Sequence, residues 1–91
     1  MHPTLTHYAS PEFWPHYRRL PQGVVRDLAD EKFELLKADP RHPSLHLKRV
    51  GEYWSVRVGL AYRAVGTACE GGIIWFWIGS HRDYERLVHG T

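Results

Sequence analysis

The fold is decided by residues 53–65, YWSVRVGLAYRAV, and by residues 71–87, GGIIWFWIGSHRDYERL. The first segment contains two runs rich in Val, Tyr and Trp, separated by Gly59, as expected for paired strands. Glu70-Gly71-Gly72 is typical of a second hairpin turn and leads into a third apolar run. We therefore predict three successive antiparallel strands that lead into a short C-terminal helix. The predicted strands span residues 53–58, 62–67 and 73–78.

The loop at Gly59 decides which way two arginines point. A two-residue loop would place Arg57 and Arg63 on opposite faces of the sheet, whereas a three-residue loop, residues 59–61, pairs them on the same face. The longer loop fits the side-chain pattern better, because it gathers apolar residues on the other face. These are Trp54, Val56, Val58, Tyr62 and Ala64.

Two like charges directly opposite each other destabilise a sheet, and a phosphate between Arg57 and Arg63 would relieve that repulsion. The alternative is that each arginine pairs separately with a surface carboxylate such as Glu52 or Asp83. The sequence leaves both interpretations open.

Ser80-His81-Arg82-Asp83 matches a capping box at the start of the C-terminal helix, with Ser80 as N-cap and Asp83 reaching back. A helix N-terminus disfavours further positive charge, so we expect His81 to be neutral at neutral pH. A neutral imidazole accepts a proton, and its protonated form donates one. The simpler interpretation is an exposed first-turn histidine. Tyr84 is expected to dock this helix on the sheet, or to donate a proton if its hydroxyl faces the arginines.

The N-terminal half has the pattern of a helical scaffold. Ser10-Pro11 predicts a first helix, with Ser10 as its N-cap, that ends at Leu20-Pro21. A second helix is predicted over residues 21–37, and Asp39-Pro40 ends it. Its apolar stripe comprises Val24, Val25, Leu28, Ala29, Phe33, Leu35 and Leu36. The two helices form a hairpin whose apolar face must cover the sheet.

Residues 4–8 and 45–50 also alternate in polarity, which indicates an edge strand and a strand preceding the turn at Gly51-Glu52. Trp75 and Trp77 are expected to share one face of the third predicted strand. The fold class is therefore α+β, with an N-terminal helical hairpin packed on an antiparallel sheet of about four strands and a short C-terminal helix. Residues 1–91 form one domain.

Composition excludes several classes of protein. No apolar run reaches the roughly 20 residues of a membrane span, and the N-terminus lacks a signal pattern. The single Cys69 excludes an internal disulfide and a Cys-rich zinc site, so we expect a reducing cytoplasm. Residues 1–40 carry five Lys/Arg and six Asp/Glu, whereas residues 41–91 carry seven and four. The positive excess lies with the predicted sheet, as a surface facing nucleic acid requires. A mildly basic solvated surface has the same charge balance, so charge alone leaves both interpretations open.

Three segments together resemble the RelE/ParE superfamily of bacterial toxins from type II toxin–antitoxin systems. They are DPRHPSL at 39–45, WSVRVG at 54–59 followed by YRA at 62–64, and WFWIGSH at 75–81 followed by Tyr84 and Leu87. The resemblance covers nearly the whole chain and implies a twisted antiparallel sheet with a helical hairpin on one side. It also implies a cognate antitoxin as partner, which covers the open face of the sheet or displaces the terminal helix.

RelE-like members use that open face to cut mRNA in the ribosomal A site without metal. The implied reaction is attack of a ribose 2′-hydroxyl on the adjacent phosphate, which needs a base, a cation and an acid. By position in the motifs, Arg57 and Arg63 would hold the phosphate. His81 would be the general acid or base, assisted by Tyr84. Residues expected to bind the RNA backbone are Lys48, Arg49 and Arg82, and no cofactor is expected.

Two other functions stay open. ParE-like relatives share the fold but act on DNA gyrase without nuclease chemistry. An inert module of the same fold would only bind a partner protein.

Overall fold

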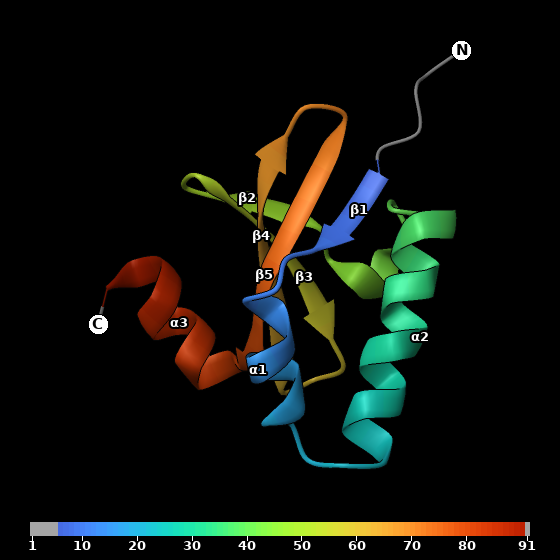
Figure 1. The fold of residues 1–91 in the computed structure, drawn as a ribbon, viewed down its shortest axis with the longest axis vertical. Helices are drawn as coiled ribbons and strands as arrows, with labels where there is room; N and C mark the ends of the chain where they lie inside the picture. Colours follow the sequence, from blue (N-terminus) through green and yellow to red (C-terminus); the bar gives the residue numbers. More distant parts are fainter. Residues whose placement is uncertain (1–5, 91) are drawn as a thin grey trace.

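A computed structural model of the chain describes residues 6–90. Within them, one five-stranded sheet has the strand order β1-β5-β4-β3-β2, with α2 and α3 on opposite sides (Figure 1). The elements are β1 (Thr6–Ala9), α1 (Phe13–Arg18), α2 (Val24–Ala38), the 3₁₀ turn η1 (Pro43–Leu45), β2 (Lys48–Val50), β3 (Tyr53–Val58), β4 (Tyr62–Cys69), β5 (Gly72–Ser80) and α3 (His81–His89). The α+β class, with two helices before the sheet and a short helix after it, is confirmed.

The sheet has one strand more than expected and is mixed, because β1 joins β5 in parallel. The predicted edge strand at residues 4–8 is Thr6–Ala9, and residues 4 and 5 lie outside the described part. β1 comes so close to β5 that a side chain on Gly72 would collide with the carbonyl oxygen of Thr6. The neighbour and direction of an N-terminal strand are set by tertiary contacts, which local patterns do not encode.

The three-residue loop is confirmed. Val58 pairs with Tyr62, and Arg57 pairs with Arg63. Gly59 has φ +67°, and a Cβ there would lie 2.6 Å from Leu28 Cδ2, so only glycine fits between this loop and α2.

Several predicted boundaries are wrong. The first helix begins at Phe13 with Glu12 as N-cap and no side-chain cap, so Ser10 does not cap it. The second begins at Val24, which is 80% exposed and not part of the apolar stripe. The predicted strand at 45–50 is shorter, because Leu45 ends η1 and His46 takes the left-handed conformation with φ +43°.

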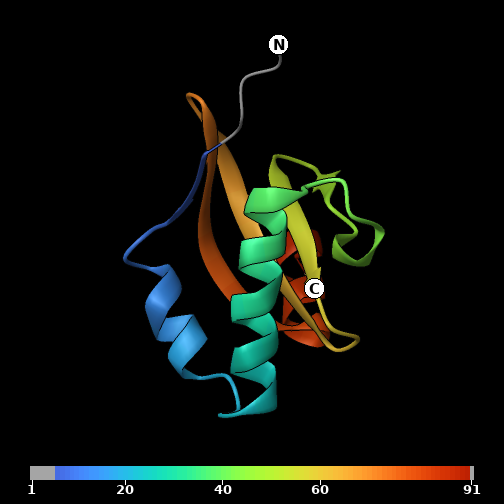
Figure 2. The same ribbon diagram turned by 90° about the vertical axis from the view of Figure 1, so that its right-hand side faces the viewer.

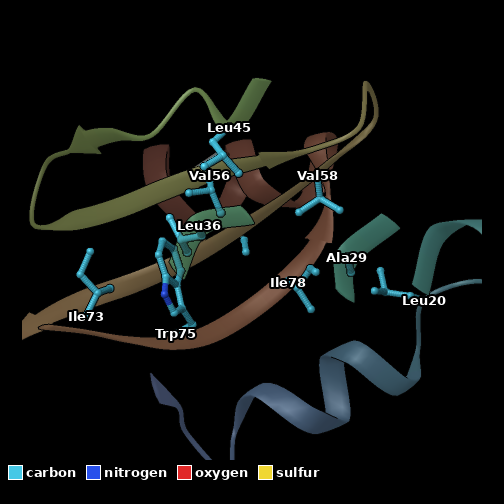
Figure 3. Packing of buried hydrophobic residues seen from close by; sticks show 10 residues of the cluster. Leu20, Ala29, Leu36, Leu45, Val56, Val58, Ile73, Trp75 and Ile78 are labelled. Carbon is cyan, nitrogen blue, oxygen red and sulfur yellow. The ribbon is translucent and has the colours of Figure 1, made fainter. Parts of the chain in front are cut away.

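The hydrophobic core lies between the sheet and the two N-terminal helices, which cover the same face (Figure 2). Leu36 of α2 packs with Val56, and the indole of Trp75 lies beside Leu36 in the same cluster (Figure 3). Trp75 pairs with Gly66 and Trp77 pairs with Val65, although Val65 and Gly66 are adjacent on β4. The reason is that the register with β5 shifts between these two residues. The two tryptophans therefore do not share a face, contrary to the prediction. No helix in residues 6–90 is long and apolar enough to cross a membrane.

Candidate functional site

The second face of the sheet is not fully open, because α3 covers part of it. Val65 and Ser55 have no exposed surface, and Arg63 is only 6% exposed. Tyr84 of α3 is 2% exposed, which confirms that it docks the helix. A charged side chain is therefore buried between the sheet and α3, where an apolar layer would be the ordinary arrangement.

Arg63 is held by hydrogen bonds and an aromatic ring. Its Nε donates to Ser55 Oγ at 2.7 Å, and its Nη2 donates to the carbonyl oxygen of His46 at 3.4 Å. Its guanidinium carbon lies 5.0 Å from the centre of the Tyr84 ring. Burial lowers the pKa of Arg63; Tyr84 opposes this shift, and the like charge of Arg57 adds to it.

Neither arginine forms an ion pair with a carboxylate within residues 6–90. Asp83 pairs instead with Arg86, at 4.0 Å between Oδ1 and Nη1. The interpretation in which Glu52 or Asp83 neutralises each arginine is therefore wrong for the described part of the chain.

Arg57 is half-buried beside Arg63, and its Nη1 lies 3.4 Å from His46 Nε2. His46 thus contacts both arginines, one through its ring and the other through its backbone oxygen. Sequence reasoning missed His46 because the alternation around it indicated a strand. Its left-handed backbone has no sequence signal comparable to a glycine, although histidine is among the residues that tolerate it.

His81 lies at the junction of β5 and α3, as predicted. Ser80 Oγ accepts a hydrogen bond from the backbone N–H of Asp83 at 3.1 Å, which confirms Ser80 as the N-cap. The backbone N–H of His81 donates to the carbonyl oxygen of Ala61 at 2.8 Å, so the loop between β3 and β4 fixes the start of α3. The imidazole stacks on Tyr84, with 5.6 Å between ring centres, and 55% of the side chain is exposed.

Glu85 joins His81 to the end of the helix. Its Oε1 lies 3.3 Å from His81 Nε2, and its Oε2 lies 3.1 Å from His89 Nε2. Glu85 was not among the predicted site residues, although its position four residues after His81 on a helix places the two side chains together.

The structure brings together four predicted residues in one series of contacts, from Arg57 and Arg63 through Tyr84 to His81. Lys48 pairs with Ser55 and thus lies on the same face. Arg49 does not join them, because it pairs with Trp54. Its guanidinium lies over the Trp54 indole, on the face covered by α1 and α2. Arg82 is exposed on α3. Among residues 6–90, no three His, Cys, Asp or Glu side chains are placed to hold a metal ion.

Residues 25–86, more than half of the chain, match the ParE-like toxin domain family. A chain of the RelB–RelE antitoxin–toxin complex from Methanococcus jannaschii has a TM-score of 0.68 and 17% identity, covering 88% of this chain and 96% of that chain. A mutant of E. coli toxin RelE in the free state has a TM-score of 0.64 and 16% identity, covering 96% of this chain and 92% of that chain. A chain of the YoeB dimer from Staphylococcus aureus has a TM-score of 0.55 and 18% identity, covering 86% of this chain and 98% of that chain. A comparison with curated protein sequences gives no significant match. At these identities the structural likeness establishes the fold.

Proposed function

This chain belongs to the ParE-like toxin domain family of the RelE/ParE superfamily, and on that premise we propose that it is a ribosome-dependent mRNA endonuclease that stops translation. One observation carries the proposal. Arg57 and Arg63 face the same side of the sheet, neither forms an ion pair with a carboxylate of residues 6–90, and Tyr84 connects Arg63 to the imidazole of His81.

Arg57 and Arg63 are suited to bind the scissile phosphate. Charge develops on the phosphate oxygens in the transition state, and fixed guanidinium groups stabilise that charge without reorganising. Two arginines held opposite each other by strand pairing supply such fixed donors. His81 then transfers the proton that the reaction needs, and Tyr84 keeps its ring in place by stacking.

The burial of Arg63 adds a requirement. Arg57 is partly accessible, but Tyr84 covers the guanidinium of Arg63. We propose that α3 tilts away from the sheet when RNA binds, so that both arginines reach the phosphate. Among the RNA-binding candidates, Lys48 lies on the correct face, and Arg82 is accessible at the start of α3. Arg49 would contact RNA only beyond the edge of the sheet at β2.

The proposed partners are the ribosome with its mRNA, and a cognate antitoxin. An antitoxin segment that replaces α3 would take Tyr84 from Arg63 and draw His81 away from the arginines. Neutralisation would then follow from the loss of site geometry.

The test is to induce the chain in bacterial cells and to follow pulse-labelled protein synthesis and DNA synthesis together. Early collapse of translation, with mRNA cut within translated codons, supports the nuclease. Intact mRNA with arrested replication would assign the protein to gyrase inhibition, and growth without a defect would indicate a module that only binds a partner.

Variants connect that result to the site. We expect His81→Ala and Arg63→Ala to relieve growth arrest while remaining folded. Arg18→Ala is the matched control for Arg63→Ala, because it removes the same type of side chain from an exposed position on α1. Full toxicity of both site variants would refute the assignment.

A further inference from the structure

We infer that His46 is a second catalytic imidazole, which acts as the general base, while His81 acts as the general acid. This inference rests on the proposed nuclease function and divides the two proton transfers between two histidines. It follows from the hydrogen-bond partners of each ring.

The contact with Arg57 fixes the role of His46. A guanidinium group only donates hydrogen bonds, so His46 Nε2 must be the acceptor at 3.4 Å from Arg57 Nη1. In this contact Nε2 carries no proton, and its lone pair is directed at Arg57. When Arg57 turns to the phosphate, this lone pair is released next to the bound RNA and can accept a proton, as a general base requires.

The backbone holds this imidazole in place. His46 follows η1 as its C-cap and takes the left-handed conformation, with φ +43°. Its carbonyl oxygen accepts a hydrogen bond from Arg63 Nη2 at 3.4 Å. A non-glycine residue in this conformation carries strain that the surrounding contacts must offset. Arg57 on β3 therefore contacts the ring of His46, and Arg63 on β4 contacts its backbone carbonyl oxygen, so that both parts of His46 are held in place.

The loop around His46 leaves room for a ligand. A cavity of about 290 Å³ opens beside the imidazole, close to the lower size limit of small-ligand pockets. Its lining residues are Pro40, Arg41, His42, Pro43, His46 and Leu47. Part of a nucleotide placed there would lie against His46 and be close to the cation of Arg41.

His81 has the opposite arrangement. A carboxylate only accepts, so the contact of 3.3 Å between Glu85 Oε1 and His81 Nε2 places a proton on Nε2. A proton held on Nε2 is what a general acid requires. His46 thus presents a lone pair, and His81 presents a proton.

The reaction balances with these two groups. His46 Nε2 takes the proton of the ribose 2′-hydroxyl as the 2′-oxygen bonds to phosphorus. The bond from phosphorus to the 5′-oxygen breaks, and that oxygen takes a proton from His81. The products are a 2′,3′-cyclic phosphate and a 5′-hydroxyl end.

The experiment uses His46→Gly, because glycine fits the positive φ and leaves a space for free imidazole. Cleavage of a reporter mRNA on purified ribosomes is measured by primer extension under single-turnover conditions. We expect a rate about 10²–10⁴-fold below wild type, partly restored by added imidazole. Arg57→Ala is expected to lose activity without any rescue. The rise of the wild-type rate on the acid side of its pH profile should be absent in His46→Gly.

His46→Asn is a second variant that tolerates the same backbone conformation but carries no base. It should remain folded in urea unfolding, be inactive and not be rescued. Wild-type rates for both variants would overturn the inference while leaving the nuclease assignment intact. Low activity that imidazole does not restore, with an unchanged pH profile, would also overturn it. Absence of cleavage by the wild-type chain would overturn the proposed function and this inference together.

Discussion

The two faces of the sheet are built on different principles. The face under α1 and α2 buries aliphatic side chains such as Val56 and Val58 against Leu36. The face under α3 buries Arg63 and Ser55 against Tyr84. Both faces come from the same strands, since neighbouring residues along a strand point in opposite directions.

This difference separates stability from function. Aliphatic burial is the main favourable contribution to folding, whereas a buried charge without an ionic partner costs free energy. A protein of 91 residues has a small core to offset such a cost. We infer that the polar face is maintained for its chemistry, and that substitutions on the two faces should have opposite consequences.

The largest effect on stability is expected on the apolar face. Leu36→Ala removes a side chain that is 2% exposed and leaves a cavity, so it should lower the free energy of unfolding by about 2–5 kcal/mol. Val24→Ala is the control on the same helix, because Val24 is 80% exposed and should change little. Urea unfolding measures both. Similar losses in the two variants would contradict the described packing of α2.

The polar face should show the reverse. The double variant Ser55→Ala with Arg63→Met removes both partners of the 2.7 Å hydrogen bond, so that only the longer 3.4 Å bond from Arg63 Nη2 to the His46 carbonyl oxygen is lost without replacement. Stability should stay equal or increase, because apolar groups often replace a buried charge without loss. Cleavage should fall about 10²–10³-fold, as for the loss of one donor to a developing anion. A large loss of stability with retained activity would reverse the roles that we assign to the two faces.

A smaller effect is expected from Glu85→Gln, which keeps the shape of the side chain and removes its charge. Glu85 contacts His81 at an exposed position, where such pairs contribute about 0.2–1 kcal/mol, so cleavage should fall only about two- to five-fold. Glu34→Gln, on α2 and paired only with Lys37 among the described residues, is the control. An unchanged cleavage rate would exclude Glu85 as a positioning residue.

The smallest effect concerns His7, whose imidazole lies against the buried indole of Trp75. Burial, and secondarily the charge of Lys37, lowers the pKa of His7 below its usual 6.5. His7 Nδ1 accepts from Trp75 Nε1 at 3.2 Å, which also requires a deprotonated nitrogen. The unfolded chain therefore binds the proton more readily, so the contribution of His7 is complete above pH 6.5 and is lost as the pH falls through the folded pKa. Urea unfolding at pH 7.5 and pH 5.5 should show a greater acid loss in wild type than in His7→Asn. Equal losses would contradict this role.

Local patterns were sufficient for a large part of the site. The period of two along β3 and β4, combined with the glycine loop, predicts that Arg57 and Arg63 share a face. The capping signal at Ser80 places His81 at the start of α3. Both follow from contacts between residues close in sequence, for which spacing determines geometry.

Other features of the structure were not predicted, because they depend on contacts between residues that are far apart in the sequence. The covering of Arg63 by Tyr84 joins β4 to α3, and His46 reaches the arginines only after an unexpected turn. The register shift between β4 and β5 separates Trp75 from Trp77, and no residue pattern marked it.

The sequence by itself determined the α+β class, the three-stranded antiparallel unit with its same-face arginines, and the strand-to-helix junction that carries His81. The packing of the elements adds that β1 joins in parallel, that Arg63 is buried, and that His46 contacts Arg57 while Glu85 contacts His81. The physical reason is that periodicity fixes the direction of a side chain relative to its own element. The partner that it meets is decided by how the elements pack.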